Sequence, residues 1–143
     1  MTAIIDASVL AKWFVEAEQG TADARRLRPL ALFAPDLAIV ELTNVLWKKV
    51  RRGEFDARFV PRALSALRHA NLSLTDSLSL ADRAVEIAIE LDHAVYDCFY
   101  LSLAERQGLP FVTADDHLGR KLAAKPAASY AEVLNLSQFV TQL

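Results

Sequence analysis

The chain lacks the sequence features of disulfide-bonded secreted proteins, cysteine-rich zinc-binding proteins and membrane-spanning proteins. Cys98 is the only cysteine, which excludes an internal disulfide and a cysteine-rich zinc site. The longest run without a charged residue covers residues 133–143, well short of the roughly 20 residues that cross a bilayer. A signal peptide requires early basic residues, but Asp6 comes first and Lys12 interrupts the apolar stretch. We therefore expect a cytoplasmic protein that begins at Met1 and has no membrane segment.

The chain also has no large excess of positive or negative charge, and it has no flexible linker. The 16 basic and 18 acidic residues give a net charge of −2, so any contact with a polyanion must be local. Four glycines and five prolines are too few to mark a linker, and we find no internal repeat. With 143 residues, 53% of them hydrophobic, the chain is long enough to bury the core of one domain.

The hydrophobic pattern predicts short strands that alternate with helices. We expect helices over residues 9–14, 21–27, 36–52, 56–69, 75–91, 94–108 and 115–124. We expect strands near residues 2–8, 72–74, 110–113 and 133–134, and a strand or connection over residues 29–35. Asp36 is the predicted N-cap of the long helix over residues 36–52, and Gly53 ends it. This alternation indicates an α/β domain with a short-stranded parallel sheet flanked by helices, whose reactive edge lies where strands give way to helices.

Four acids interrupt apolar segments at this edge or in the helices next to it. They are Asp6, Glu41, Asp97 and Asp115. Asp97 shares a helix face with Leu101 and Ala104 and is expected to point inward. Because a buried carboxylate without a partner is costly, this residue needs a structural or chemical reason.

Convergence of the four acids would create a site for a hard cation. An all-oxygen ligand set favours Mg²⁺ or Mn²⁺ over zinc, and such an ion suits phosphodiester hydrolysis. Separate roles are equally open at this point. Asp6 and Asp115 can be helix N-caps, Glu41 a solvated residue, and Asp97 an acid that favours the helix dipole.

Four segments that contain these acids resemble the signature regions of PIN-domain ribonucleases, and most closely those of the VapC toxin branch. In chain order they are IIDASVLAKW (residues 4–13), VELTNVL (40–46), YDCFYLSLA (96–104) and FVTAD (111–115). The resemblance extends to about residue 122. It implies a PIN-like fold, cleavage of RNA with Mg²⁺ or Mn²⁺, inhibition by a cognate VapB-type antitoxin, and a homodimer.

The resemblance also assigns roles to individual residues. The metal-binding acids would be Asp6, Glu41, Asp97 and Asp115. Thr113 would orient the last acid or a water molecule, which makes it part of the catalytic set. Auxiliary positions would be Ser8, Asn44 and Asp116, the last as an extra acid or a helix cap.

Basic and aromatic residues outside these motifs allow two interpretations. The basic run of residues 48–52 can contact an RNA backbone or simply be a solvated helix end. Cys98 is expected in the core, and the three histidines at the surface or in packing. Trp13, Phe14, Trp47 and Phe55 belong either to the core or to an exposed antitoxin groove or dimer face.

Two other functions remain compatible with strand-end acids. A phosphoacceptor receiver domain also binds Mg²⁺ at such an edge, but it would have an acidic pair near the first strand and a lysine after a late strand. Here Asp6 stands alone and Asp115 takes the place of the lysine. A PIN-fold interaction module without catalysis is the second alternative, and the complete acid set argues against it.

Overall fold

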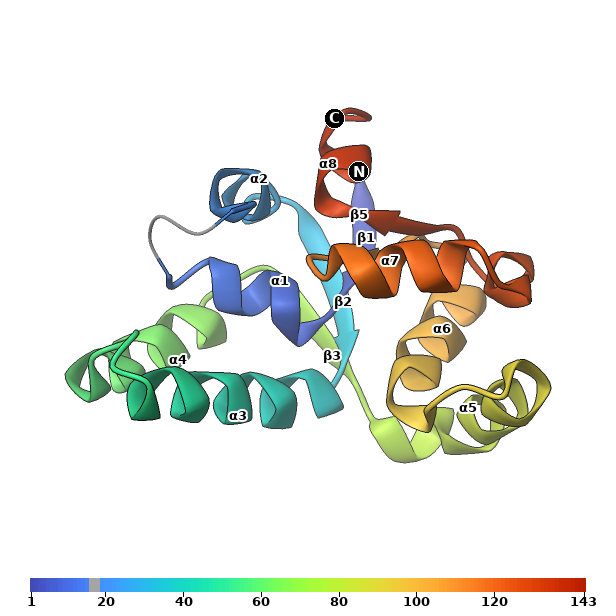
Figure 1. Ribbon diagram of the computed structural model, residues 1–143, viewed down its shortest axis with the longest axis horizontal. Helices are drawn as coiled ribbons and strands as arrows, with labels where there is room; N and C mark the ends of the chain where they lie inside the picture. Colours follow the sequence, from blue (N-terminus) through green and yellow to red (C-terminus); the bar gives the residue numbers. More distant parts are fainter. Residues whose placement is uncertain (16–18) are drawn as a thin grey trace.

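A parallel sheet forms the centre of the protein (Figure 1). The computed structural model describes residues 1–15 and 19–143, and within them five strands lie in the order β3-β2-β1-β4-β5. All neighbouring strands run parallel. Their bounds are β1 Thr2–Ile5, β2 Ala31–Pro35, β3 Leu72–Thr75, β4 Phe111–Thr113 and β5 Val133–Asn135. The predicted α/β fold with a short-stranded parallel sheet is confirmed.

Helices cover both sides of this sheet. Their bounds are α1 Ala7–Lys12, α2 Thr21–Arg26, α3 Leu37–Arg51, α4 Val60–Arg68, α5 Ser77–Leu91, α6 Val95–Gln107, α7 Asp116–Ala123 and α8 Leu136–Val140, with short 3₁₀ turns at Ala57–Phe59 and Pro126–Ser129. In Figure 1, α1, α3 and α4 lie on one side of the sheet and α5 and α6 on the other. None of the helices in residues 1–15 and 19–143 has both the length and the hydrophobicity to cross a membrane.

Helix α6 is buried around most of its circumference because the sheet lies on one side of it and α5 on the other. It contacts β1, β2, β4 and α5, and Cys98 and residues 100–104 are buried. Cys98 is the core residue that the sequence predicted, and burial raises the pKa of its thiol to about 11. A thiol in that state is a poor nucleophile at neutral pH.

Asp36 differs from its predicted role. It occupies the N-cap position of α3, but its side chain makes no capping bond there. Its carboxylate instead accepts hydrogen bonds from the amide and hydroxyl of Ser77, whose Oγ in turn accepts the Leu37 amide at 3.2 Å. The reason is topological: β2 and β3 are neighbours, so the helices that follow them begin side by side.

Helix α8, at Leu136–Val140, was not predicted from the sequence.

The strand register brings the first and last signature motifs together. Ile4 pairs with Phe111 and Ile5 with Val112, so Asp6 follows β1 at the level where Thr113 ends β4. Because parallel strands end at the same edge of a sheet, residues more than 100 positions apart become neighbours there.

Two glycines allow a direct test of local backbone geometry. Gly108 ends α6 with φ +65°, and a Cβ added there would have no atom within 4 Å. Gly119 lies inside α7, and a Cβ added there would lie 3.4 Å from its nearest neighbour, the Thr113 Cγ2. We expect Gly108→Ala to lower the free energy of unfolding by about 1 kcal/mol, because a Cβ is strained at that φ. Gly119→Ala should be neutral or stabilising, since alanine is the better helix former. Denaturant unfolding of both variants checks this, and equal losses would contradict it.

Candidate functional site

The four predicted acids line one cleft of about 250 Å³ beside the carboxyl ends of β1 and β4. Its wall is formed by Asp6, Ala7, Ser8, Glu41, Asn44, Val45, Asp97, Tyr100, Asp115 and Leu118. We call it the acidic cleft. The acids reach it from four elements: the end of β1, helix α3, the first turn of α6 and the start of α7.

Asp6 is the most buried of these acids, with 8% of its surface exposed. It is the N-cap of α1 and accepts hydrogen bonds from the Ser8 amide at 3.1 Å, the Val9 amide at 3.3 Å and the Ser8 hydroxyl at 2.5 Å. Burial raises the pKa of Asp6 to about 6, the Ser8 and Thr113 hydroxyls partly oppose this, and the negative charge of Glu41 adds to it. The cap interpretation is therefore correct and compatible with a place in the cleft.

Two hydroxyls connect Asp6 to the end of β4. The Ser8 Oγ lies 3.2 Å from the Thr113 Oγ1 and accepts a hydrogen bond of 3.0 Å from the Ala114 amide. Thr113, which is fully buried, accepts the Asp115 amide at 3.2 Å. The Asp115 carboxylate itself caps α7 by accepting the Leu118 amide at 2.9 Å and remains exposed. Ser8 and Thr113 thus set the spacing between the first and last acids.

Glu41 is held by a tyrosine that the sequence analysis missed. The Tyr100 hydroxyl donates to Glu41 Oε1 at 2.6 Å, and the tyrosine ring stacks on Phe111 with centroids 5.3 Å apart. Burial raises the pKa of Glu41, the bond from Tyr100 opposes this, and the charge of Asp97 adds to it. The available signal was a tyrosine three residues after Asp97, within the mostly apolar first half of the helix.

Asp97 is held by His93, which in turn contacts Lys125, and the sequence analysis missed both residues. Its Oδ2 lies 2.7 Å from His93 Nε2, and the Lys125 ammonium lies 3.3 Å from His93 Nδ1. Because an ammonium group can only donate, Nδ1 accepts and Nε2 carries the proton that is donated to Asp97. The His93 side chain is 4% exposed and that of Asp97 24%. Asp97 is therefore half-buried and has a polar partner, as expected of an acid that points inward.

The remaining predicted residues divide between the cleft and the surface near it. Asn44 lines the cleft from α3 and is exposed. Asp116 is the first residue of α7, is exposed and is not part of the cleft wall. His117 is exposed as well. An auxiliary role for Asp116 stays a prediction.

The donor chemistry of the cleft fits a hard divalent ion. Apart from the Tyr100 phenol, its titratable donors are carboxylates. Burial, with a smaller contribution from repulsion between the carboxylates, raises the pKa values of Asp6 and Glu41, and a cation would lower them. Across the described residues, no three His, Cys, Asp or Glu side chains are arranged to hold one ion directly. Each carboxylate except Asp115 instead faces a protein side chain. Mg²⁺ commonly binds through one or two carboxylates and keeps several waters, so the arrangement is compatible with it.

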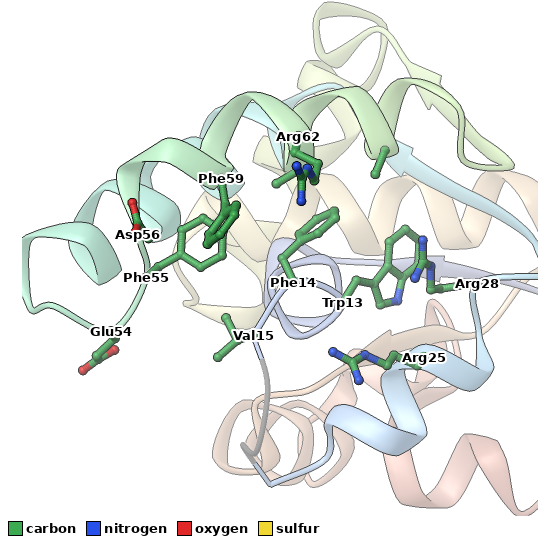
Figure 2. Close-up of a pocket in the computed structure, with 12 residues that line it drawn as sticks. Trp13, Phe14, Val15, Arg25, Arg28, Glu54, Phe55, Asp56, Phe59 and Arg62 are labelled. Atoms are coloured by element: carbon green, nitrogen blue, oxygen red, sulfur yellow. The ribbon is translucent and has the colours of Figure 1, made fainter.

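The predicted aromatic set separates into a groove and a surface residue. Trp13 is 4% exposed, Phe14 and Phe55 are partly buried, and Trp47 is 54% exposed. The first three line a groove of about 670 Å³, which we call the aromatic groove, together with Val15, Arg25, Arg28, Glu54, Asp56, Phe59, Arg62, Ala63 and Ala66. In the view of Figure 2, Arg62 and Arg25 enter it from opposite sides.

Comparison with known proteins agrees with the geometry. The PIN domain family matches residues 3–123. The chain belongs to the PIN-domain family. A ribonuclease VapC3 from Pyrobaculum aerophilum is 32% identical over 87% of this chain and 97% of its own length. That similarity places the chain in the VapC branch, as the four motifs predicted.

Further similarities cover different shares of the chain. An exonuclease VapC9 from Pyrobaculum aerophilum is 35% identical over 62% of each chain. The crystal structure of PAE2754 from the same organism has a TM-score of 0.69 at 23% identity and covers 99% of this chain and 97% of its own. A toxin-antitoxin complex from Klebsiella pneumoniae has a TM-score of 0.62 at 17% identity, covering 87% and 93%. These two structures support the same fold.

The buried charge at Asp6 predicts a stability gain on its removal. A carboxyl whose pKa is raised by folding stabilises the protein below its unfolded value of 3.8, and this contribution is lost as the pH rises through about 6. In EDTA at pH 7.5, we expect Asp6→Asn to be more stable than the unmodified protein by up to about 3 kcal/mol. Urea unfolding from pH 4 to 8 measures this. A difference that does not shrink toward pH 4 would contradict the assignment.

Proposed function

We propose that this PIN domain is a Mg²⁺- or Mn²⁺-dependent endoribonuclease and the toxin of a toxin-antitoxin pair. The observation that carries the proposal is the convergence of four carboxylates from distant segments on one cleft. The shared family with a VapC ribonuclease over most of the chain supports RNA as the substrate. Because the second relative is named an exonuclease, the cleavage experiment must distinguish internal from terminal cutting.

The residues that would hold the ion are Asp6, Glu41, Asp97 and Asp115. When bound, such an ion supplies positive charge that offsets the phosphate charge and activates water for attack on phosphorus. One or two of the carboxylates would contact it, and the others would act through ordered water. This is consistent with side chains that line one cleft without converging on a single point.

The protein's own contribution is to keep these acids ionised and in place. Ser8 and Thr113 hydroxyls stabilise the charged form of Asp6 against burial. Tyr100 does the same for Glu41, and His93 fixes the orientation of Asp97. Reacting groups must be held within fractions of an ångström. We therefore expect the residues that donate these hydrogen bonds to affect turnover although they do not contact RNA.

The aromatic groove is the surface we assign to the antitoxin. It combines apolar rings with three arginines, Arg25, Arg28 and Arg62, so it suits a peptide with apolar and acidic side chains. The Klebsiella pneumoniae structure that shares the fold is a toxin-antitoxin complex, which supports an antitoxin as the partner. Homodimerisation is part of the same proposal and rests on the family resemblance.

The catalytic assignment is tested by neutral replacements of the acids. We expect Asp6→Asn and Asp97→Asn each to reduce Mg²⁺-dependent RNA cleavage at least about 100-fold, because each removes a charge that the ion requires. Cleavage of an RNA labelled at both ends, with internal products resolved on a gel, measures the rate and separates internal from terminal cutting.

The matched control is Asp82→Asn, which removes an exposed carboxylate on α5 outside the cleft and should leave the rate unchanged. Undiminished cleavage by both cleft variants would refute the assignment. A folded protein that cleaves no RNA and whose melting temperature does not respond to divalent ions would favour the inactive interaction module instead.

The contact from His93 to Asp97 predicts a positioning effect. We expect His93→Ala to lower kcat about tenfold and to raise the Mg²⁺ concentration needed for half-maximal rate, since Asp97 loses the donor that orients it. His93→Gln retains an N–H donor and should recover part of the rate. His69→Ala, at an exposed histidine bonded to the Ser65 carbonyl, is the control. Equal activity of all three variants would exclude a role for the contact.

A further inference from the structure

A row of exposed side chains leads along α3 away from the acidic cleft. The cleft shares Glu41 and Asn44 with a neighbouring hollow, which is also lined by Trp47 and Tyr96. That hollow shares Trp47 with a third one, lined by Lys48, Arg51 and Arg52. The three hollows therefore form one continuous path, which we call the α3 track.

The aromatic side chains of this track are open to solvent. Trp47 is 54% exposed and Tyr96 61%, whereas Trp13 is buried. The Arg51 guanidinium carbon lies 5.0 Å from the centre of the Trp47 ring. A solvent-exposed aromatic side chain with a guanidinium group over its ring is typical of surfaces that stack nucleic-acid bases.

The charges of the track change sign along its length. Its cleft end carries Glu41, and its far end carries Lys48, Arg51 and Arg52. Within residues 1–15 and 19–143, no ion pair links those three basic side chains to a carboxylate. Cations at a helix C-terminus are favourable by themselves, but the helix dipole gives no reason for an exposed tryptophan between them and the cleft.

The length of the track suits a short stretch of RNA. From Glu41 to Arg52 the helix rises about 16 Å at roughly 1.5 Å per residue, enough for two or three nucleotides. Stacking on side chains requires bases whose faces are free, which a duplex does not offer. Phosphates of the same strand would meet the basic side chains, which neutralise charge without reading sequence.

We propose that the α3 track binds single-stranded RNA next to the scissile bond, with bases stacked on Trp47 and Tyr96 and phosphates on Lys48, Arg51 and Arg52. This inference rests on the proposed ribonuclease function and adds the conformation of the substrate and the path that it takes. It assigns Trp47 as a substrate-binding residue outside the four signature motifs.

Binding without cleavage is the direct test. In an Asp97→Asn background with Mg²⁺ present, fluorescence anisotropy of a labelled single-stranded RNA gives Kd. We expect Trp47→Leu to raise Kd at least about fivefold, as loss of one base stack does. Arg51→Gln should weaken binding and lower the salt slope by about one. A duplex of the same sequence should bind more weakly and respond little to Trp47→Leu.

The aromatic groove supplies a matched control. Phe59 is 44% exposed, and the Arg62 guanidinium carbon lies 5.5 Å from its ring centre, so the same type of pair occurs there away from the cleft. Phe59→Leu and Arg62→Gln should leave RNA affinity unchanged. If they weaken binding as much as Trp47→Leu and Arg51→Gln, binding is diffuse and the track is refuted.

Two further readouts separate the possible failures. Sedimentation of the same variants tests whether the face joins two copies of the chain: a dimer that Trp47→Leu dissociates, with RNA affinity unchanged, would overturn the RNA track. With Asp97 restored, cleavage by Trp47→Leu at an unchanged KM would overturn the track and leave the ribonuclease proposal standing. No cleavage by the unmodified protein and no RNA binding in the Asp97→Asn background would overturn both.

Discussion

The cost of placing carboxylates close together out of water is the constraint on which this structure depends. Asp6 sits almost fully buried between the ends of β1 and β4, and both its burial and the charge of Glu41 favour its neutral form. Two hydroxyls and two amides counter this cost in part. A bound positive charge would relieve burial and repulsion together, which is the physical basis of the proposed cation site.

Asp6, Glu41 and Asp97 each have side-chain anchors, and the anchors come from different layers of the fold. Ser8 belongs to the first turn of α1, Thr113 to the end of β4, Tyr100 to the middle of α6, and His93 to the turn before α6. Packing fixes these anchors: Tyr100 is stacked on Phe111 in the core. The rigidity of the site therefore derives from the hydrophobic core beneath it rather than from the loops around it, a common feature of preorganised sites.

Local charge differs sharply from the near-neutral total. The acidic cleft, the basic end of α3 and the arginines of the aromatic groove lie on one small domain with a net charge of −2. An RNA strand, a divalent ion and an acidic peptide place different demands on a surface. Separate patches allow one chain to meet all three, and the shared lining residues of the α3 track join two of these patches into one path.

The sequence by itself determined the α/β class and most of the strands and helices, although not α8, and it singled out the four acids that the structure places at the cleft. This was possible because short apolar strands, strand-end acids and helix-ending glycines such as Gly53 and Gly108 are local signals. Two of the acids have partners close in sequence: Ser8 lies two residues from Asp6, and His93 lies four residues from Asp97. Only the tertiary structure decided the distant contacts. The contacts of Glu41 with Tyr100 and of His93 with Lys125 join residues 59 and 32 positions apart. Such pairings arise from how helices pack on a sheet, and no local pattern in the chain encodes them.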